Sequence, residues 1–303
     1  MNPQQETVHD RIPAGESVRA RLLAGLPVIE RQVQLAGVST AVLEGGDGPP
    51  MVLLHGPGEF AASWLAVLPA LVRTHRVIAP DLPGHGASEV VDGRQTADRV
   101  LGWLEELIAE TCSEPPVLVG RVIGGAVGAR FAIQMGARLN SLVLVDTLGL
   151  TQFEPAPRFA LAMQRFLAAP TASSYDRFMD FCSFDLDGLR DLLDPRWEAF
   201  QAYAIELAAK PSVQAALGGL IAELAGPIPS AELVRIDVPT SLIWGRHDLA
   251  TPLQVAESAS AKYGWPLYVI EGAGDDPALE QPTAFLDALS DALTTTTSSA
   301  AVS

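Results

Sequence analysis

The stretch LVGRVIGG, residues 118–125, places two glycines around Val122, directly after an apolar run and before a segment with helical spacing. Gly120 and Gly124 are the flanking pair, and Gly125 continues the run of small residues. A chain that turns sharply from a strand into a helix needs small residues at such positions, because the two elements approach closely. The stretch therefore predicts a strand, a tight turn centred on Val122 and a helix.

Strand-like and helix-like patterns alternate on both sides of this turn. Short apolar runs typical of buried strands occur in MVLLHG (51–56), HRVIAPDLPGHGAS (75–88), LNSLVLVDTLG (139–149), VPTSLIWGRHD (238–248) and WPLYVIEGAG (265–274). Helical patterns separate these runs, most clearly over residues 95–111, and residues 29–46 have the pattern of a hairpin. This alternation predicts an α/β fold with a mostly parallel sheet and helices on both faces.

The alternation is interrupted once. Residues 150–232 contain no convincing buried strand but several helical stretches rich in Phe, Leu, Ala and Met. We therefore predict a helical insert at 150–232 in a core formed by residues 29–149 and 233–293. Residues 1–28 are predicted to be an N-terminal extension, and the polar stretch 294–303 a disordered tail.

Composition excludes several classes of protein. The 303 residues, 48% of them hydrophobic, predict a folded chain with a sizeable core. A formal net charge of −16 argues against nucleic acid and anionic membranes as partners, because both favour Lys and Arg. No apolar run reaches the ~18 residues that cross a bilayer, and the N-terminus lacks a signal-peptide pattern.

The two cysteines, Cys112 and Cys182, fit a reducing compartment, and no spacing of Cys or His suggests a metal. We therefore expect a soluble cytoplasmic protein without a metal or a cofactor. The oligomeric state stays open from the sequence, and a homodimer is one of the alternatives.

Five motifs resemble, in order and spacing, those of the α/β-hydrolase superfamily. They are LLHGPGEFAASW (53–64), IAPDLPGHGAS (78–88), LVGRVIGGAVGARFA (118–132), LIWGRHDLATP (242–252) and IEGAGDDPALEQP (270–282). With the intervening elements they span roughly residues 29–292, and they are most similar to capped members such as meta-cleavage-product hydrolases and haloperoxidase-like esterases. The resemblance implies the α/β-hydrolase fold, in which the insert is a helical cap over a small-molecule pocket.

The same resemblance implies where a catalytic triad would lie. The family nucleophile occupies the centre of G-x-S-x-G, and that position is Val122 here, which offers neither a lone pair nor a proton. The family base is a histidine in a motif such as G-x-G-H-x-P, and Asp275 takes that place before Asp276 and Pro277. Asp248 matches the family acid. The sequence therefore predicts that the Ser-His-Asp mechanism is absent.

The oxyanion hole of the family needs two backbone N–H donors. Ile123 supplies one, whereas the other position is Pro57, which has no N–H, so that Gly58 would have to replace it. We expect a ligand to contact Gly56, Pro57, Gly58, Val122 and Ile123. The histidines do not replace the missing base, because His55 and His85 are expected to be structural and His247 is expected to point away from Asp248.

Two side-chain groups remain as candidates for chemistry. If Asp248 and Asp275 face each other, repulsion would raise the pKa of one carboxyl, which would act as an acid while the other accepts protons. The alternative is that Asp275 only binds nearby backbone or water. Arg121 is expected either to form an internal ion pair or to offer its guanidinium to a carboxylate ligand, and Glu59 to be a solvated loop residue.

Three functions stay open from the sequence. The first is an enzyme that acts on a small apolar or carbonyl-containing molecule by non-serine chemistry: aspartate-assisted proton transfer, a lyase step or hydrolysis. The second is a non-catalytic small-ligand binder, and the third an interaction pseudoenzyme with a vestigial pocket. A filled cavity under the cap would favour the third.

The turn itself raises a physical question. The family's elbow residue has a positive φ angle, which a β-branched side chain tolerates badly. The turn at Val122 is therefore expected either to be relaxed or to be held in a strained conformation by the packing of the glycines.

Overall fold

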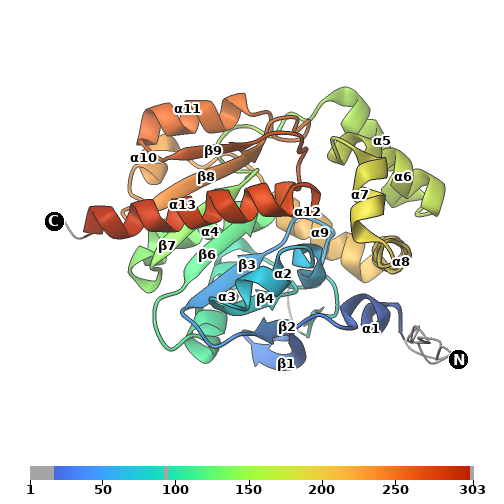
Figure 1. Cartoon of the computed structure of the whole chain (residues 1–303), viewed down its shortest axis with the longest axis horizontal. Helices are drawn as coiled ribbons and strands as arrows, with labels where there is room; N and C mark the ends of the chain where they lie inside the picture. Colours follow the sequence, from blue (N-terminus) through green and yellow to red (C-terminus); the bar gives the residue numbers. More distant parts are fainter. Residues whose placement is uncertain (1–16, 92–94, 301–303) are drawn as a thin grey trace, which may run out of the picture.

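The computed structural model describes residues 17–91 and 95–300 and contains a nine-stranded sheet with the order β1-β2-β4-β3-β6-β7-β8-β9, in which β5 pairs with β2 (Figure 1). The strands are β1 (Ile29–Leu35), β2 (Val38–Gly45), β3 (Pro50–Leu54), β4 (Arg76–Pro80), β5 (Glu89–Val90), β6 (Val117–Arg121), β7 (Ser141–Val145), β8 (Thr240–Gly245) and β9 (Leu267–Ile270). The hairpin β1–β2 and the pair β2–β4 are antiparallel, whereas β4, β3, β6, β7, β8 and β9 run parallel. The predicted mostly parallel sheet is confirmed.

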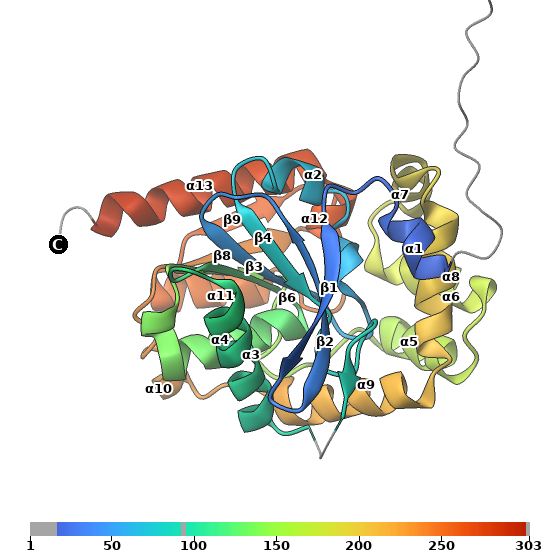
Figure 2. The same ribbon diagram turned by 90° about the horizontal axis from the view of Figure 1, so that it is seen from below.

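Helices cover both faces of this sheet, as Figure 2 shows. The helices of the core are α2 (Leu68–Leu71), α3 (Ala97–Thr111), α4 (Ile123–Met135), α10 (Ser230–Leu233), α11 (Gln254–Tyr263), α12 (Pro277–Glu280) and α13 (Pro282–Ala300), with short 3-10 turns at Ala61–Trp64 and Gly136–Arg138. Helices α3, α4 and α11 lie on one face, and α2 and α13 on the other. The central strands β3, β6 and β7 are buried along their whole length, which explains why their sequences are uninterrupted apolar runs.

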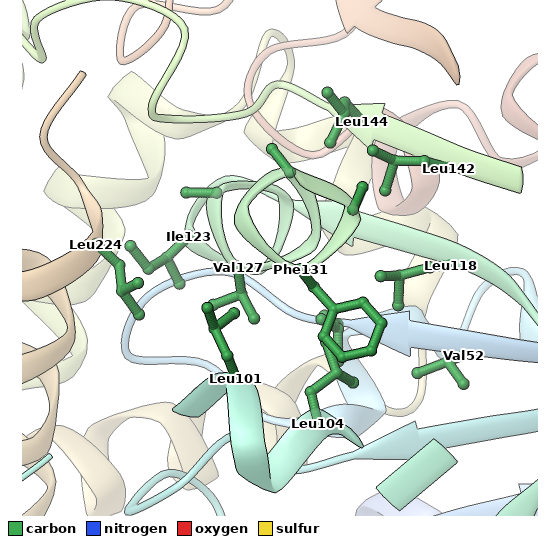
Figure 3. Close-up of a cluster of buried hydrophobic side chains, with 14 of the residues drawn as sticks. Val52, Leu101, Leu104, Leu118, Ile123, Val127, Phe131, Leu142, Leu144 and Leu224 are labelled. Atoms are coloured by element: carbon green, nitrogen blue, oxygen red, sulfur yellow. The ribbon is translucent and has the colours of Figure 1, made fainter. Parts of the chain in front are cut away.

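Helix α4 is the centre of one half of the core. Its residues Ile123, Val127 and Phe131 pack between the sheet and the neighbouring helices α3 and α9, as Figure 3 shows. Because α4 follows Val122 directly, this packing fixes where the turn ends and how the first turn of the helix is oriented.

A second group of helices lies in the chain between β7 and β8. They are α5 (Pro157–Ala168), α6 (Ala172–Cys182), α7 (Leu186–Leu193), α8 (Trp197–Ala208) and α9 (Pro211–Leu224). Figure 1 shows α5 to α8 gathered at one end of the sheet. All five fall within the segment 150–232, which we call the cap; its exact limits stay a prediction.

Both ends of the described chain are helical. Helix α1 (Val18–Leu23) contacts α8 of the cap, as Figure 2 shows, and part of the predicted extension 1–28 lies outside the described residues. At the other end α13 continues to Ala300, although a disordered tail was predicted from residue 294. The structure thus differs from the expected tail over 294–300, and the limits of the tail stay a prediction.

Within residues 17–91 and 95–300, no helix combines the length and the apolar character needed to cross a membrane.

Candidate functional site

Val122 lies at the turn between β6 and α4 with φ 49° and ψ −107°. Its N–H donates to the Val145 carbonyl oxygen at 3.0 Å, and its own carbonyl oxygen accepts from the Leu148 N–H at 3.1 Å. The positive φ angle is unfavourable for a β-branched residue, so the turn has the strained conformation rather than the relaxed one.

Close packing around the turn holds this conformation. A Cβ atom on Gly120 would come within 2.5 Å of the Gly124 carbonyl oxygen, and one on Gly124 within 2.5 Å of the Leu54 carbonyl oxygen. Real Cβ atoms do not approach backbone so closely, and the glycines therefore let strand and helix meet at the turn. The side chain of Val122 is only 6% exposed, and its burial in the core offsets part of the strain.

Asp248 follows β8 and is held by hydrogen bonds from its own loop. Its carboxylate accepts from the Ala250 N–H at 2.6 Å, from the Thr251 N–H at 2.9 Å and from the Thr251 hydroxyl. Burial raises the pKa of Asp248 to about 6, although these donors act in the opposite direction. The carboxyl is 4% exposed and fixed in orientation.

Asp275 lies in the loop between β9 and α12 and is partly buried. Its N–H donates to the Cys182 carbonyl oxygen at 2.9 Å, and its carbonyl oxygen accepts from Arg121 at 3.0 Å. Burial raises the pKa of its carboxyl well above the usual range, and the negative charge of Asp248 raises it further. The structure therefore brings Asp248 and Asp275 into the same site; their catalytic role stays a prediction.

A third carboxyl, which we did not predict, completes this group. Asp146 follows β7, is 0% exposed and has a φ angle of 44°. Its Oδ1 accepts from the Gly245 N–H at 2.9 Å, and its carboxyl lies beside that of Asp248. One signal for Asp146 is present in the sequence: it directly follows the apolar run of β7. The carboxyl ends of neighbouring parallel strands meet at one edge of a sheet, so a residue in this place lies near the residues that follow β8.

Arg121 connects the loops on either side of the turn. Its guanidinium pairs with Glu59 and, at 3.2 Å, with Asp276. These acids raise the pKa of Arg121 above its usual value, although burial alone would lower it. Of the two alternatives for Arg121, the internal ion pair is the one observed. The expectation of a solvated Glu59 is wrong, because its carboxylate binds Arg121 and also accepts the Gly56 N–H at 3.0 Å.

Comparison with known proteins places this fold and site in a family. The sequence profile described as "Alpha/beta hydrolase family" matches residues 51–288. The chain belongs to the alpha/beta hydrolase family.

This chain is similar to two curated proteins that are hydrolases. It is 28% identical over 274 residues to the 2-hydroxy-6-oxo-6-(2'-aminophenyl)hexa-2,4-dienoic acid hydrolase of Metapseudomonas resinovorans, covering 86% of this chain and 89% of that protein. It is 30% identical over 241 residues to the 2-hydroxymuconate semialdehyde hydrolase of Pseudomonas sp. (strain CF600), covering 76% of this chain and 81% of that protein. Among solved structures, the 2-hydroxy-6-oxo-6-phenylhexa-2,4-dienoate hydrolase of Rhodococcus sp. strain RHA1 superposes with a TM-score of 0.76 at 26% identity, over 88% of this chain and 99% of that one.

The loop after β3 of this alpha/beta hydrolase is fixed by His55. The His55 Nε2 accepts the Leu82 N–H at 2.9 Å, so the proton is assigned to Nδ1, which donates to the Gly56 carbonyl oxygen at 2.8 Å. Burial lowers the pKa of His55 to about 4, which keeps the ring neutral. His85 is likewise buried, with its pKa lowered to about 4. Both are placed to brace the loops, as expected.

The residues predicted to bind a ligand do not all present side chains to one space. Figure 3 shows the side chain of Ile123 packed toward Leu224 of α9, so that only its backbone can face the site. Gly58 has a φ angle of 74°, and a Cβ there would lie 3.6 Å from Leu217 of α9. The cap therefore lies directly on the loop after β3, and the binding role of Gly56, Pro57, Gly58, Val122 and Ile123 stays a prediction.

A cavity of about 480 Å³ opens beside the turn rather than over it. It is lined by the chain after β7, residues 147–154, by Ser230 and by residues of the segment 250–263. Two of its lining residues hold the acidic site: Thr251 donates to Asp248, and Thr147 donates to the Val122 carbonyl oxygen at 3.3 Å. This cavity is not lined by Val122 or Asp275, so it differs from the pocket predicted over the turn.

The cap also contributes a thiol to the site. Cys182, the last residue of α6, is 6% exposed, and its carbonyl oxygen accepts the Asp275 N–H at 2.9 Å. Burial raises the pKa of Cys182 well above its usual value, and Asp275 raises it further, so the thiol is not poised as a nucleophile. Within the described residues, no three His, Cys, Asp or Glu side chains are arranged to hold a metal ion.

Proposed function

We propose that this alpha/beta hydrolase family protein acts on a small carbonyl compound by proton transfer between Asp275 and Asp248, without a serine nucleophile. The observation that carries the proposal is the pair of adjacent carboxyls with different protonation behaviour beside Val122. Burial holds the pKa of Asp248 at about 6, whereas the pKa of Asp275 lies well above the usual range. In such a pair one carboxyl is the proton acceptor and the other the proton donor.

The chemistry suited to such a pair is proton exchange on an enolisable carbonyl compound. Asp275 delivers a proton to the carbonyl oxygen, and the ionised Asp248 takes up the proton that leaves the neighbouring carbon. The names of two relatives, a 2-hydroxymuconate semialdehyde hydrolase and a hydroxy-oxo-dienoic acid hydrolase, describe substrates that carry both a carbonyl and an enol. A compound of this class is the proposed substrate.

The test measures the exchange of carbon-bound hydrogen for deuterium in deuterium oxide. Acetylacetone and 2-hydroxymuconate semialdehyde are the substrates, and NMR monitors the exchange. We expect catalysed exchange by the wild type and a loss of about a hundredfold or more in Asp275→Asn, as for removal of a general acid. Asp180→Asn on the exposed face of α6 is the matched control and should leave the rate unchanged. Equal rates for Asp275→Asn and the wild type would refute the proposal.

A second candidate, non-catalytic binding of a small molecule, is favoured by the 480 Å³ cavity beside the site. Binding to the folded state raises the melting temperature in proportion to the logarithm of ligand concentration. A concentration-dependent shift with the same carbonyl compounds, without exchange or turnover, would support this candidate over the first. No shift and no exchange would leave the interaction pseudoenzyme as the better account.

A further inference from the structure

Asp146 is the most deeply enclosed carboxyl of the acidic site. It is 0% exposed, and its position after β7 places it between Val145, whose carbonyl oxygen binds the turn, and Gly245 at the end of β8. One oxygen, Oδ1, accepts the Gly245 N–H at 2.9 Å, whereas Oδ2 receives no donor although it is buried. An ionised carboxylate with an unsatisfied buried oxygen is costly.

The groups around Asp146 do not supply a counter-charge. The carboxyls of Asp248, from the loop after β8, and of Asp275, from the loop before α12, both act on it, and both disfavour its ionised form. Arg121 of β6 is the cation that acts on Asp146, but its guanidinium is bound by Glu59 and Asp276. Two buried carboxyls in contact cannot both be ionised at a reasonable cost in free energy.

The hydrogen bonds of Asp248 decide which of the two carboxyls keeps the proton. Asp248 accepts from two backbone N–H groups and from the Thr251 hydroxyl, and all three donors favour its ionised form. Asp146 accepts a single N–H, and its free Oδ2 is the atom available to carry a hydrogen toward Asp248. A proton on Oδ2 would give the orphaned oxygen a role and would form a hydrogen bond to the neighbouring Asp248 carboxylate.

We propose that Asp146 is a positioning residue that stays protonated at neutral pH and donates a hydrogen bond from Oδ2 to ionised Asp248. The hydrogen bond between Asp146 and Asp248 contains one proton. This proton remains on Asp146 while Asp248 exchanges a different proton with Asp275. The catalytic consequence of this arrangement rests on the proposed function, whereas the protonation of Asp146 does not.

The direct test is NMR of the carboxyl carbons in protein labelled at aspartate, with the signals assigned from Asp146→Asn and Asp248→Asn. We expect the Asp146 carboxyl of the wild type to keep the shift of a protonated acid through pH 8, where Asp248 is ionised. A signal of Asp146 that titrates below pH 7 would overturn the inference.

Two substitutions at the same position give a second readout. Asn at position 146 keeps the shape and supplies a permanent N–H donor, so in Asp146→Asn we expect the titration midpoint of Asp248 to stay within a few tenths of a pH unit. Asp146→Ala removes the donor and should raise that midpoint by about one to two pH units. A larger rise in Asp146→Asn than in Asp146→Ala would contradict the proposed donor.

The two proposals fail in different ways. A wild type that keeps Asp146 protonated but exchanges no carbon-bound hydrogen would refute the proposed function and support the inference on Asp146. Catalysed exchange in a protein whose Asp146 is ionised at neutral pH would refute the inference alone.

Discussion

At the scale of single residues, the turn at Val122 shows how packing can override an intrinsic preference. A non-glycine residue in such a backbone conformation costs on the order of 1–3 kcal/mol, and it persists only where the surroundings determine it. Here the close approach of β6, α4 and β3 at Gly120 and Gly124 leaves no room for the turn to relax. The buried valine side chain contributes stability that offsets this strain.

The strain at Val122 is expected to reverse the usual order of stability, in which an alanine variant is more stable than a glycine variant. We expect Val122→Gly to be more stable than Val122→Ala by about 1 kcal/mol, because both lose the buried methyl groups but only glycine accepts the positive φ angle without strain. Urea unfolding of both variants measures the difference. Val119, buried in the middle of β6 without a positive φ angle, is the matched position, and there the alanine variant should be the more stable. The same order at both positions would contradict a strained turn.

The structure also shows which parts of the site a sequence can reveal. The strand–turn–helix at Val122 was predictable because apolar runs and glycine spacing are local signals. The meeting of Asp248 with Asp275 was expected from the resemblance, which places them at the acid and base positions of the triad. The partners of Arg121 were not, since Glu59 is 62 residues away in the chain and pairs through side-chain conformation alone. Asp146 was overlooked because an acid after a buried strand does not by itself reveal its neighbours.

At the scale of elements, helix α1 ties the cap to the core. Arg19 is 8% exposed and reaches both: it donates to Tyr203 of α8 at 2.9 Å and pairs with Asp81 of the core at 2.8 Å. Asp81 in turn accepts the N–H groups of Ala61 and Ala87, from the two loops that border the site. The helical pattern before residue 28 predicted an extension, but its docking depends on contacts with α8, more than 170 residues later.

We expect Arg19→Met to loosen the cap, because it leaves the buried carboxyl of Asp81 without its cation. The readout is the reactivity of the Cys182 thiol, which is buried where α6 meets the loop of Asp275, in a Cys112→Ser background. An aromatic disulfide reagent should modify Cys182 faster, roughly tenfold for each 1.4 kcal/mol lost from the closed state. Arg21→Met, on the exposed side of the same helix, is the control. Equal rates in Arg19→Met and Arg21→Met would show that α1 does not hold the cap.

At the scale of the whole molecule, the acidic site ties stability to pH. Several of its carboxyls have pKa values raised by burial: Asp146, Asp248, Asp275, Asp276 and Glu280. A carboxyl whose pKa is higher in the folded than in the unfolded protein binds more protons when folded, so its contribution to stability falls as pH rises toward the folded value. The buried histidines act in the opposite sense, and most strongly at lower pH. With folded pKa values of about 4, His55 and His85 destabilise the protein as pH falls below their unfolded value of 6.5.

From pH 6.5 to 8 each of these histidines loses its remaining half-proton in the unfolded chain, which raises the free energy of unfolding by about 0.4 kcal/mol per histidine, less than each carboxyl lowers it. The pKa values of Asp276 and Glu280 are about 7, and each group should therefore lower the free energy of unfolding by about 1 kcal/mol across this window. We expect the melting temperature to fall as the pH rises from 6.5 to 8, by about 2–4 °C for each kcal/mol. Scanning calorimetry at constant ionic strength measures the slope.

The double variant Asp276→Asn/Glu280→Gln should flatten that slope, because it removes the two groups that lose their protons within the window. Asn at position 276 still offers an oxygen to the Leu279 N–H, which Asp276 accepts at 3.2 Å, so the start of α12 keeps its cap. Asp187→Asn is the matched control, since that side chain is 91% exposed. A melting temperature that is constant or rises from pH 6.5 to 8 in the wild type would mean that these carboxyls are already ionised in the folded protein.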